Sequence, residues 1–166
     1  MRTIYLAGPD VFRKDATDYL QGLKDLCSQY GFIGLSPLDN EIEPTATNQS
    51  SMSNAIFSGN IQLLNECDIV IANLNPFRGP NVDDGTAFEI GFAGAKGKII
   101  YGYTFFNETT LKQLTSIFSQ FYSIYPQVED FGHCRNLMIV NAIEESGGKI
   151  MKRFEDCLKH LNEQVL

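Results

Sequence analysis

The stretch that decides the fold is Asp68-Ile69-Val70-Ile71-Ala72-Asn73-Leu74, a β-branched, apolar run between an aspartate and a loop. Because the run is apolar at consecutive positions, it predicts a strand that is buried on both faces. Such strands are typical of parallel sheets whose two faces are covered by helices. Similar short runs at residues 3–8, 32–35 and 98–103 predict three further strands.

The segments between these strands show the apolar spacing of amphipathic helices. The predicted helices cover residues 15–30, 54–67, 85–96, 110–121 and 149–161. Residues 137–140 could form a fifth strand. This alternation predicts an α/β fold, an open parallel sheet of about five strands with helices on both faces. No linker or internal repeat interrupts the chain, so we expect residues 1–166 to form a single domain.

The charge balance and the apolar runs exclude two classes of partner. The 166 residues include 13 Lys and Arg against 20 Asp and Glu, a formal net charge of −7. Nucleic acid polymers need a basic surface, although local contacts in an acidic protein can still hold a small nucleoside. No apolar run reaches the roughly 18–20 residues of a membrane span, and the first apolar stretch is too short for a signal peptide. We therefore expect a cytoplasmic protein that contacts neither nucleic acid polymers nor membranes.

The sequence shows no pattern that requires a metal or a cofactor. The four cysteines are scattered without a Cys-x-x-Cys pair. The two histidines are His133 and His160, and His133 is adjacent to Cys134, a spacing that rarely lets both residues bind one zinc ion. The turn at Gly8-Pro9-Asp10 lacks both the GxGxxG and the GK[ST] fingerprints of nucleotide-binding loops. We expect buried thiols, no disulfides and no cofactor.

Candidate binding residues follow the predicted strands, because ligands of open parallel sheets bind outside the carboxyl ends of the strands. Gly8 closes the first strand in a tight turn that lets a ligand approach the backbone. Phe12 and Phe77 could stack on a base or cover part of the core. Asp39 and Asn40 could be a turn or a pair that reads a base. A polar loop over residues 41–53 follows them, and loops of this length are often functional.

Three carboxylates, Asp83, Asp84 and Glu89, surround the start of the predicted helix that follows the central strand. A structural explanation is a capping box formed by Thr86 and Glu89, or a cap formed by Asp84. The chemical explanation is a nucleophile, because the helix dipole favours an ionised Glu89. Asp83 could approach the same crevice, and two carboxyl groups about 5 Å apart are typical of retaining glycosyl transfer. The hydroxyl of Tyr5 could orient a carboxylate on the neighbouring helix, although a core position is equally compatible with the sequence.

Six segments resemble the nucleoside 2-deoxyribosyltransferase family. They are residues 4–12 (IYLAGPDVF), 37–40 (PLDN), 67–74 (CDIVIANL), 76–79 (PFRG), 83–91 (DDGTAFEIG) and 136–138 (NLM). The segments occur in order from about residue 3 to about residue 140, and the GTAFE-type segment preceded by PFRG is the most specific of them.

The resemblance implies a flavodoxin-like fold and cofactor-free transfer of 2-deoxyribose between the bases of deoxynucleosides and free nucleobases. It implies that Glu89 is the nucleophile that forms a deoxyribosyl ester, and that Tyr5 orients it. Asp83 matches an aspartate that contacts the base and is a candidate for proton transfer. Asn136, a turn residue by its spacing alone, matches an asparagine that holds the sugar 5′-hydroxyl in a neighbouring subunit's site. The family therefore implies a homo-oligomer.

Two departures from the family pattern alter these expectations. Asn60 stands where some members have an aspartate near the base, so Asp83 carries more of the proton transfer or Asn60 only binds. A predicted helix extends to Leu166, whereas many members end soon after the last strand in a carboxylate that reaches the sugar. Two alternatives stay open, a hydrolase of deoxynucleoside 5′-monophosphates and a non-catalytic nucleotide-binding module. The sequence leaves the choice between purines and pyrimidines open.

Overall fold

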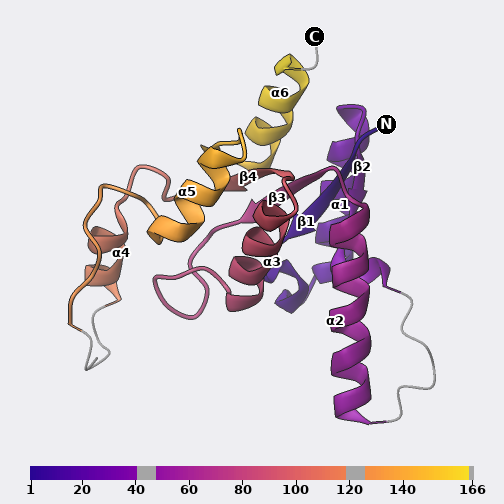
Figure 1. The fold of residues 1–166 in the computed structure, drawn as a ribbon, viewed down its shortest axis with the longest axis horizontal. Coiled ribbons are helices and arrows are strands. Elements are labelled where there is room, and N and C mark those ends of the chain that lie inside the picture. Colours follow the sequence, from indigo (N-terminus) through magenta and orange to yellow (C-terminus); the bar gives the residue numbers. More distant parts are fainter. Residues whose placement is uncertain (41–47, 119–125, 165–166) are drawn as a thin grey trace.

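The central strand, β3, has neighbours on both sides in a five-stranded parallel sheet with the order β2-β1-β3-β4-β5. The computed structural model describes residues 1–40, 48–118 and 126–164 (Figure 1). The strands are β1 (Thr3–Ala7), β2 (Ile33–Leu35), β3 (Ile69–Asn73), β4 (Ile99–Tyr103) and β5 (Ile150–Met151). All five residues of β3 are buried, so the interpretation of this segment as a strand covered on both faces is confirmed.

Helices cover both faces of the sheet and connect its strands. They are α1 (Ala16–Gln29), α2 (Gln49–Glu66), α3 (Asp84–Ala95), α4 (Leu111–Ile117), α5 (Leu137–Glu145) and α6 (Phe154–Gln164). Two 3₁₀ helices, η1 (Pro9–Phe12) and η2 (Pro37–Asp39), follow β1 and β2 directly. The predicted α/β, flavodoxin-like architecture with helices on both faces is confirmed.

Alternation along β1 decides which helix each side chain meets. Ile4 and Leu6 belong to the core under α1 and α6, whereas Tyr5 and Ala7 belong to the core under α2, α3 and α5. Successive side chains of a strand point to opposite faces, so a shift by one residue would exchange the two sets. This register places Tyr5 on the face that α3 covers.

The prediction of a strand over residues 137–140 is wrong. This segment begins α5, which Asn136 caps by accepting a hydrogen bond from the backbone N–H of Met138 at 3.0 Å. Ile139, Val140 and Ile143 are its buried residues, a helical spacing that a four-residue apolar run does not reveal. The fifth strand is the two-residue β5, which lies inside the segment predicted as the last helix.

Other helix boundaries also differ from the prediction. The helix predicted from residue 54 begins at Gln49, because Asn48 caps it by accepting from the N–H of Ser51 at 2.9 Å. Its first turns are polar, so apolar spacing alone does not reveal them. The helix predicted to end at residue 121 ends at Ile117, and residues 119–121 lie outside the described residues. Residues 41–47 of the predicted polar loop also lie outside them.

All four cysteines are free and buried. Within the described ranges, no group of three or more His, Cys, Asp or Glu side chains could hold a metal ion. No helix in the described part of the chain is both long enough and apolar enough to cross a bilayer.

Replacement of Gly148 by alanine tests the placement of β5. A Cβ at this position would overlap the carbonyl oxygen of Ile100, which is backbone and cannot move aside. We expect Gly148→Ala to lower the free energy of unfolding by at least ~2–3 kcal/mol, measured by urea denaturation. At Gly22, inside α1, an added Cβ would meet no atom within 4 Å, so Gly22→Ala should stabilise the protein by up to ~1 kcal/mol. Equal effects of the two substitutions would contradict this packing at β5.

Candidate active site

A buried hydrogen bond joins β1 to α3 at the centre of the candidate site. The hydroxyl of Tyr5 donates to Oε1 of Glu89 across 2.6 Å. Tyr5 is fully buried and Glu89 is 9% exposed. The two residues are 84 positions apart in the sequence, and the fold brings them together because Tyr5 faces α3.

The environment of Glu89 controls its charge. Burial raises the pKa of Glu89 from 4.5 to about 7, against the effect of the hydrogen bond from Tyr5, and the charge of Asp83 raises it further. Burial, and then the neighbouring charge of Glu89, raises the pKa of Tyr5 far above its usual value. Tyr5 therefore keeps its proton and donates it to the carboxylate in a hydrogen bond. The expected ionisation of Glu89 by the helix dipole is opposed by desolvation, so both charge states are populated near pH 7.

Asp83, rather than Asp84 or Thr86, caps the start of α3. Its Oδ2 accepts from the backbone N–H of Thr86 at 3.0 Å and from the Thr86 hydroxyl at 3.1 Å. The capping box of Thr86 with Glu89 is thus not formed, and Glu89 instead accepts from Tyr5. Asp83 has two properties that fit a site, a fixed position and a charge that acts on Glu89.

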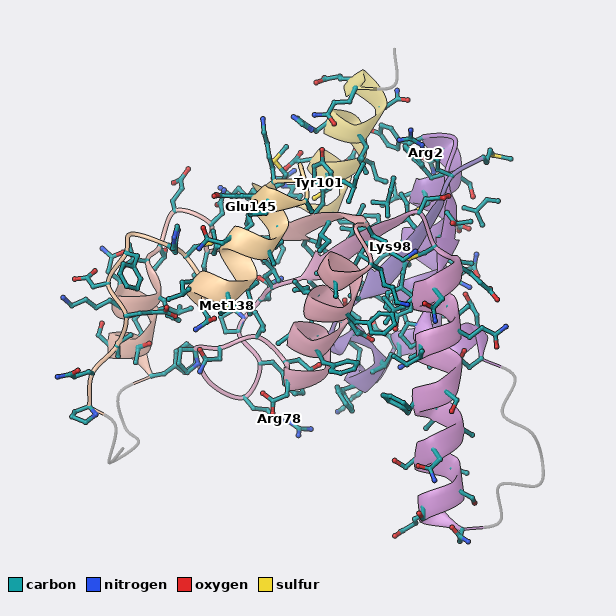
Figure 2. All side chains as sticks on the ribbon, viewed as in Figure 1. Arg2, Arg78, Lys98, Tyr101, Met138 and Glu145 are labelled. Atoms are coloured by element: carbon teal, nitrogen blue, oxygen red, sulfur yellow. The ribbon has the colours of Figure 1, made fainter. Side chains whose placement is uncertain are left out.

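Two aromatic rings meet above the carboxyl ends of β1 and β3. Phe12 of η1 and Phe77 of the β3–α3 loop stack with ring centroids 5.4 Å apart. The guanidinium carbon of Arg78 lies 5.5 Å from the Phe12 centroid and 4.6 Å from the Phe77 centroid. Phe12 is 61% exposed, and Arg78 lies at the edge of the molecule (Figure 2). The rings therefore form an exposed stack beside the strand ends, where a flat base could bind.

Gly8 makes the approach of β1 to β3 possible. It has φ +156, and a Cβ at this position would lie 2.7 Å from the Cβ of Asn73 at the end of β3. A larger residue would push the two strand ends apart. Gly8 thus positions the start of η1 and, with it, Phe12.

The residues predicted after β2 are Asp39 and Asn40, and both form local hydrogen bonds. Asp39 accepts from the backbone N–H of Ser36 at 2.8 Å and forms an ion pair with Lys24. Asn40 donates from Nδ2 to Oδ1 of Asn60 at 2.7 Å, so the structure brings these two predicted residues together. Asp39 and Asn40 both belong to the local fold, because Nδ2 of Asn40 also donates to the carbonyl oxygen of Pro37 at 3.0 Å.

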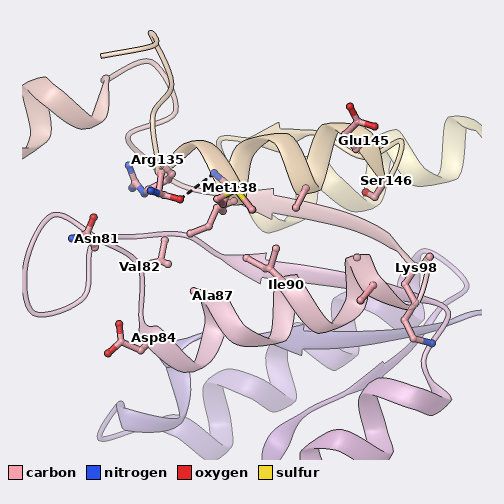
Figure 3. Close-up of a pocket in the computed structure, with 17 residues that line it drawn as sticks. Asn81, Val82, Asp84, Ala87, Ile90, Lys98, Arg135, Met138, Glu145 and Ser146 are labelled. Carbon is pink, nitrogen blue, oxygen red and sulfur yellow. Dashed lines mark hydrogen bonds between the residues drawn. The ribbon is translucent and has the colours of Figure 1, made fainter. Parts of the chain in front are cut away.

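Asn136 lines a groove of about 800 Å³ between α3 and α5 (Figure 3). Its side chain caps α5 and donates to Oε1 of Glu129 at 2.8 Å. Asp84, Ile90 and Arg135 also line the groove, but Glu89 does not. The groove is therefore a feature of the outer surface of α3, separate from the Glu89 carboxylate.

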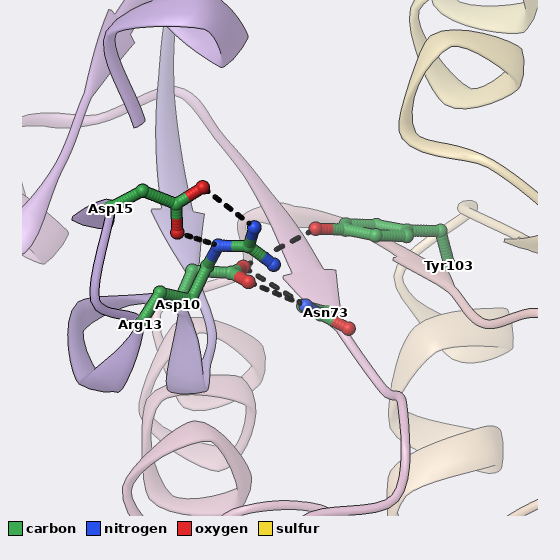
Figure 4. A network of polar contacts seen from close by, with 5 residues as sticks. All are labelled: Asp10, Arg13, Asp15, Asn73 and Tyr103. Atoms are coloured by element: carbon green, nitrogen blue, oxygen red, sulfur yellow. Dashed lines mark hydrogen bonds and ion pairs between the residues drawn. The ribbon is translucent and has the colours of Figure 1, made fainter. Parts of the chain in front are cut away.

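Sequence reasoning missed a buried polar cluster at the strand ends (Figure 4). Asp10, 7% exposed, accepts from Nδ2 of Asn73 at 3.0 Å and 2.9 Å through its two oxygens. The Tyr103 hydroxyl donates to the same carboxylate at 3.4 Å. Burial raises the pKa of Asp10, although these hydrogen bonds lower it. A carboxylate two residues after a strand-ending glycine was the available signal.

Comparison with known proteins identifies the family of this chain. Residues 4–138 match the model of the nucleoside 2-deoxyribosyltransferase family. The chain is similar to the 2-desoxiribosyltransferase from Leishmania mexicana, with 30% identity, a TM-score of 0.75 and full coverage of both chains. The resemblance deduced from the sequence segments is confirmed.

Two further similarities are more limited. A protein of unstated function from Schizosaccharomyces pombe is 38% identical over 104 residues, 61% of this chain. The matched segment spans 49% of that relative. The CMP N-glycosidase from Clostridium botulinum has a TM-score of 0.52 at 18% identity, with 98% of this chain and 99% of that chain covered. At this identity the similarity concerns the fold alone.

Glu89→Gln should change the pH dependence of stability. The folded chain binds the Glu89 proton more tightly than the unfolded chain, because burial raises the pKa from 4.5 to about 7. The stability that this group contributes is therefore present below pH ~4.5 and lost as the pH rises through ~7. Relative to the wild type, Glu89→Gln should gain about 3 kcal/mol between those limits, measured by urea denaturation.

The control for this measurement is Glu163→Gln, at an exposed position of α6. We expect its stability to follow the wild type at every pH. A Glu89→Gln variant with the same pH profile as the wild type would contradict the raised pKa of Glu89.

Proposed function

Because the chain belongs to the nucleoside 2-deoxyribosyltransferase family, we propose that it transfers 2-deoxyribose between nucleobases through a covalent ester on Glu89. The observation that carries this proposal is the buried 2.6 Å hydrogen bond from Tyr5 to Glu89. A carboxylate that is desolvated and oriented by one donor is suited to attack a carbon that develops positive charge. We include in the proposal a role in nucleoside salvage in the cytoplasm.

The proposed first step is attack by ionised Glu89 on the anomeric carbon C1′. The C1′–O ester bond forms as the C1′–N bond breaks, and the electron pair of that bond moves to the base nitrogen. Asp83 is the candidate that protonates this nitrogen: its carboxylic acid form gives the proton to the nitrogen and becomes a carboxylate. Its electrostatic effect on Glu89 supports a position near the reacting atoms. The transition state is oxocarbenium-like, so the carboxylate also stabilises it electrostatically.

In the proposed second step a ring nitrogen of a different base attacks C1′ and gives its proton to the Asp83 carboxylate. The C1′–N bond forms as the C1′–O ester bond breaks, and Glu89 leaves as a carboxylate. Two inversions give overall retention. Tyr5 stabilises the carboxylate in the free enzyme and again as it leaves. Phe12 and Phe77 are proposed to stack on the base. Gly8, Asn40 and Asn60 are proposed to shape the pocket of the base. Asp39 is proposed to act indirectly, because it holds the loop that carries Asn40.

The same proposal includes a homo-oligomer in which Asn136 completes the site of a neighbouring subunit. Three aromatic side chains cluster on the outer surface of α2 and α3: Phe57 and Phe88 lie 6.2 Å apart, and Phe88 and Phe92 lie 6.3 Å apart. Phe57 and Phe88 are 57% and 52% exposed, and Met138 on α5 is 71% exposed. Exposed apolar groups clustered in this way are typical of an interface. Asn136 caps α5, the helix that carries Met138. A second copy that docked against Met138 would therefore lie beside the Asn136 side chain.

The transfer reaction itself is tested with thymidine plus adenine, analysed by chromatography beside thymidine alone and deoxythymidine monophosphate alone. We expect deoxyadenosine only in the two-component mixture, or deoxyadenosine from deoxyinosine plus adenine if pyrimidine donors are rejected. Glu89→Ala should lower the rate at least about 10³-fold, because the nucleophile is lost, whereas Glu163→Ala should not change it. Transfer by Glu89→Ala at the wild-type rate would contradict the assignment of the nucleophile.

Two other results of the same assay would indicate a different function. Free base released from the monophosphate, without transfer, would indicate the hydrolase. Binding of nucleosides without any product would indicate the non-catalytic module.

Mixing of two impaired variants tests the shared site, at a donor concentration far below the KM of Asn136→Ala, where each variant alone is nearly inactive. In a dimer of Glu89→Ala with Asn136→Ala, one of the two sites receives both intact residues. We therefore expect the mixture to regain up to about half of the wild-type activity in mixed dimers, measured after the subunits are exchanged.

The matched control is a mixture of Glu89→Ala with Tyr5→Phe, since Tyr5 and Glu89 belong to the same subunit's site and no intact site can form. A Glu89→Ala and Asn136→Ala mixture that stays inactive would contradict the shared site. Asn136→Ala also removes the cap of α5, at a cost of ~1 kcal/mol, so its folding is checked by circular dichroism.

A further inference from the structure

Arg135 is a buried cation that is held by neutral hydrogen-bond acceptors. It is 1% exposed, and no carboxylate in the described part of the chain forms an ion pair with it. Its guanidinium donates to the carbonyl oxygen of Leu74 at 2.6 Å, to Oγ1 of Thr104 at 2.7 Å and to the carbonyl oxygen of Cys134. A buried charge is costly without such compensation, so its position is strongly constrained.

Thr104 continues from Arg135 as the next member of a chain of hydrogen bonds. Its hydroxyl donates to Oδ1 of Asn75 at 3.3 Å. Asn75 donates from Nδ2 to Oδ1 of Asn73 at 2.7 Å. Asn73 in turn donates to the buried carboxylate of Asp10 at 2.9 Å and 3.0 Å. We call these five residues, Asp10, Asn73, Asn75, Thr104 and Arg135, the strand-end chain.

Every hydrogen bond in the strand-end chain points the same way. Each of the three neutral members, Thr104, Asn75 and Asn73, accepts from the side of Arg135 and donates towards the carboxylate of Asp10. Hydrogen bonds aligned in this manner polarise one another and become stronger, particularly in a buried setting. The strand-end chain thus connects the Arg135 guanidinium to the Asp10 carboxyl group through three neutral side chains.

The strand-end chain also connects the segments that carry the candidate site. Asp10 belongs to η1 with Phe12, and Asn75 belongs to the loop that carries Phe77. Arg135 immediately precedes Asn136, the cap of α5. The three acceptors of Arg135 are Leu74, which follows β3, Thr104, which follows β4, and Cys134, which directly precedes Arg135.

We propose that the strand-end chain is the device that positions Asn136 for the sugar 5′-hydroxyl, with Thr104 and Arg135 as positioning residues. This inference rests on the proposed function, which gives Asn136 its contact. The guanidinium of Arg135 donates to Leu74, which follows β3, and to Thr104, which follows β4. These two hydrogen bonds fix the backbone immediately before Asn136. Loss of one hydrogen bond of the strand-end chain releases that backbone. The Tyr5–Glu89 pair uses none of these groups and is unchanged.

Thr104→Val tests the proposal, because valine has the shape of threonine without the hydroxyl. It leaves Nη2 of Arg135 without its acceptor and Asn75 without one of its donors. For the nucleoside donor that the wild type uses, thymidine or 2′-deoxyadenosine, KM should rise about tenfold with kcat nearly unchanged. With the matching 5′-deoxy analogue, which has no hydroxyl for Asn136 to bind, Thr104→Val and wild type should have the same KM.

Two controls separate positioning from loss of stability. Tyr101→Phe removes a buried hydroxyl from β4 that bonds to His160 at 2.8 Å, away from the chain, and should leave KM unchanged for both donors. The double variant Thr104→Val with Asn136→Ala should have the KM of Asn136→Ala alone, because the strand-end chain affects the donor only through Asn136. Additive effects, an equal KM penalty with the 5′-deoxy analogue, or a loss of kcat alone would overturn the proposal.

A wild-type protein without transfer activity would contradict the proposed function separately. The positioning claim is then judged by NMR, from the side-chain amide signals of Asn136, identified with Asn136→Ala. These signals should shift in Thr104→Val and stay in place in Tyr101→Phe. Unchanged signals in Thr104→Val would overturn the positioning of Asn136 by the chain.

Discussion

The candidate site depends on one buried contact, the hydrogen bond from the Tyr5 hydroxyl to the Glu89 carboxylate. It requires that Tyr5 point to the helix side of β1 on which α3 packs, and that α3 begin close to the end of β3. Burial raises the pKa of Glu89 to about 7, so the protonated and ionised forms of its carboxyl group are both populated near pH 7. The fold thus keeps a buried carboxyl group at a cost in stability above pH ~7, as is common at functional sites.

Around this contact, the polar groups of the strand ends act as a support. Gly8 lets β1 approach β3, and the Asp10 carboxylate is held by Asn73 at the point of contact. The same hydrogen-bonded series continues to Arg135 and the start of α5. The segments that carry Phe12, proposed to bind the base, and Asn136, proposed to bind the sugar of a neighbouring subunit's site, are therefore connected along the carboxyl ends of the strands.

The sequence predicted most of the fold because its strongest signals are local. The apolar run of β3 and the apolar spacing of α1 are properties of neighbouring residues, and both elements were predicted almost to their ends. The strand predicted over residues 137–140 was wrong because four apolar residues fit either a helix or a strand. Pairs such as Asp10 with Asn73 escaped prediction because 63 positions separate them, and only the sheet order brings them together. Asp83 forms the cap through a local contact with the N–H of Thr86, and Glu89 accepts from the distant Tyr5 instead of closing a capping box with Thr86.

The central claim is that Glu89 carries the sugar between the two bases. The most direct measurement is mass spectrometry of the protein quenched in acid after mixing with a 2′-deoxynucleoside in the absence of an acceptor base. We predict that the intact protein gains the mass of one deoxyribosyl group, that the peptide containing Glu89 carries it, and that an added base removes it. Release of the donor base without any adduct, or an adduct on a different residue, would contradict the claim.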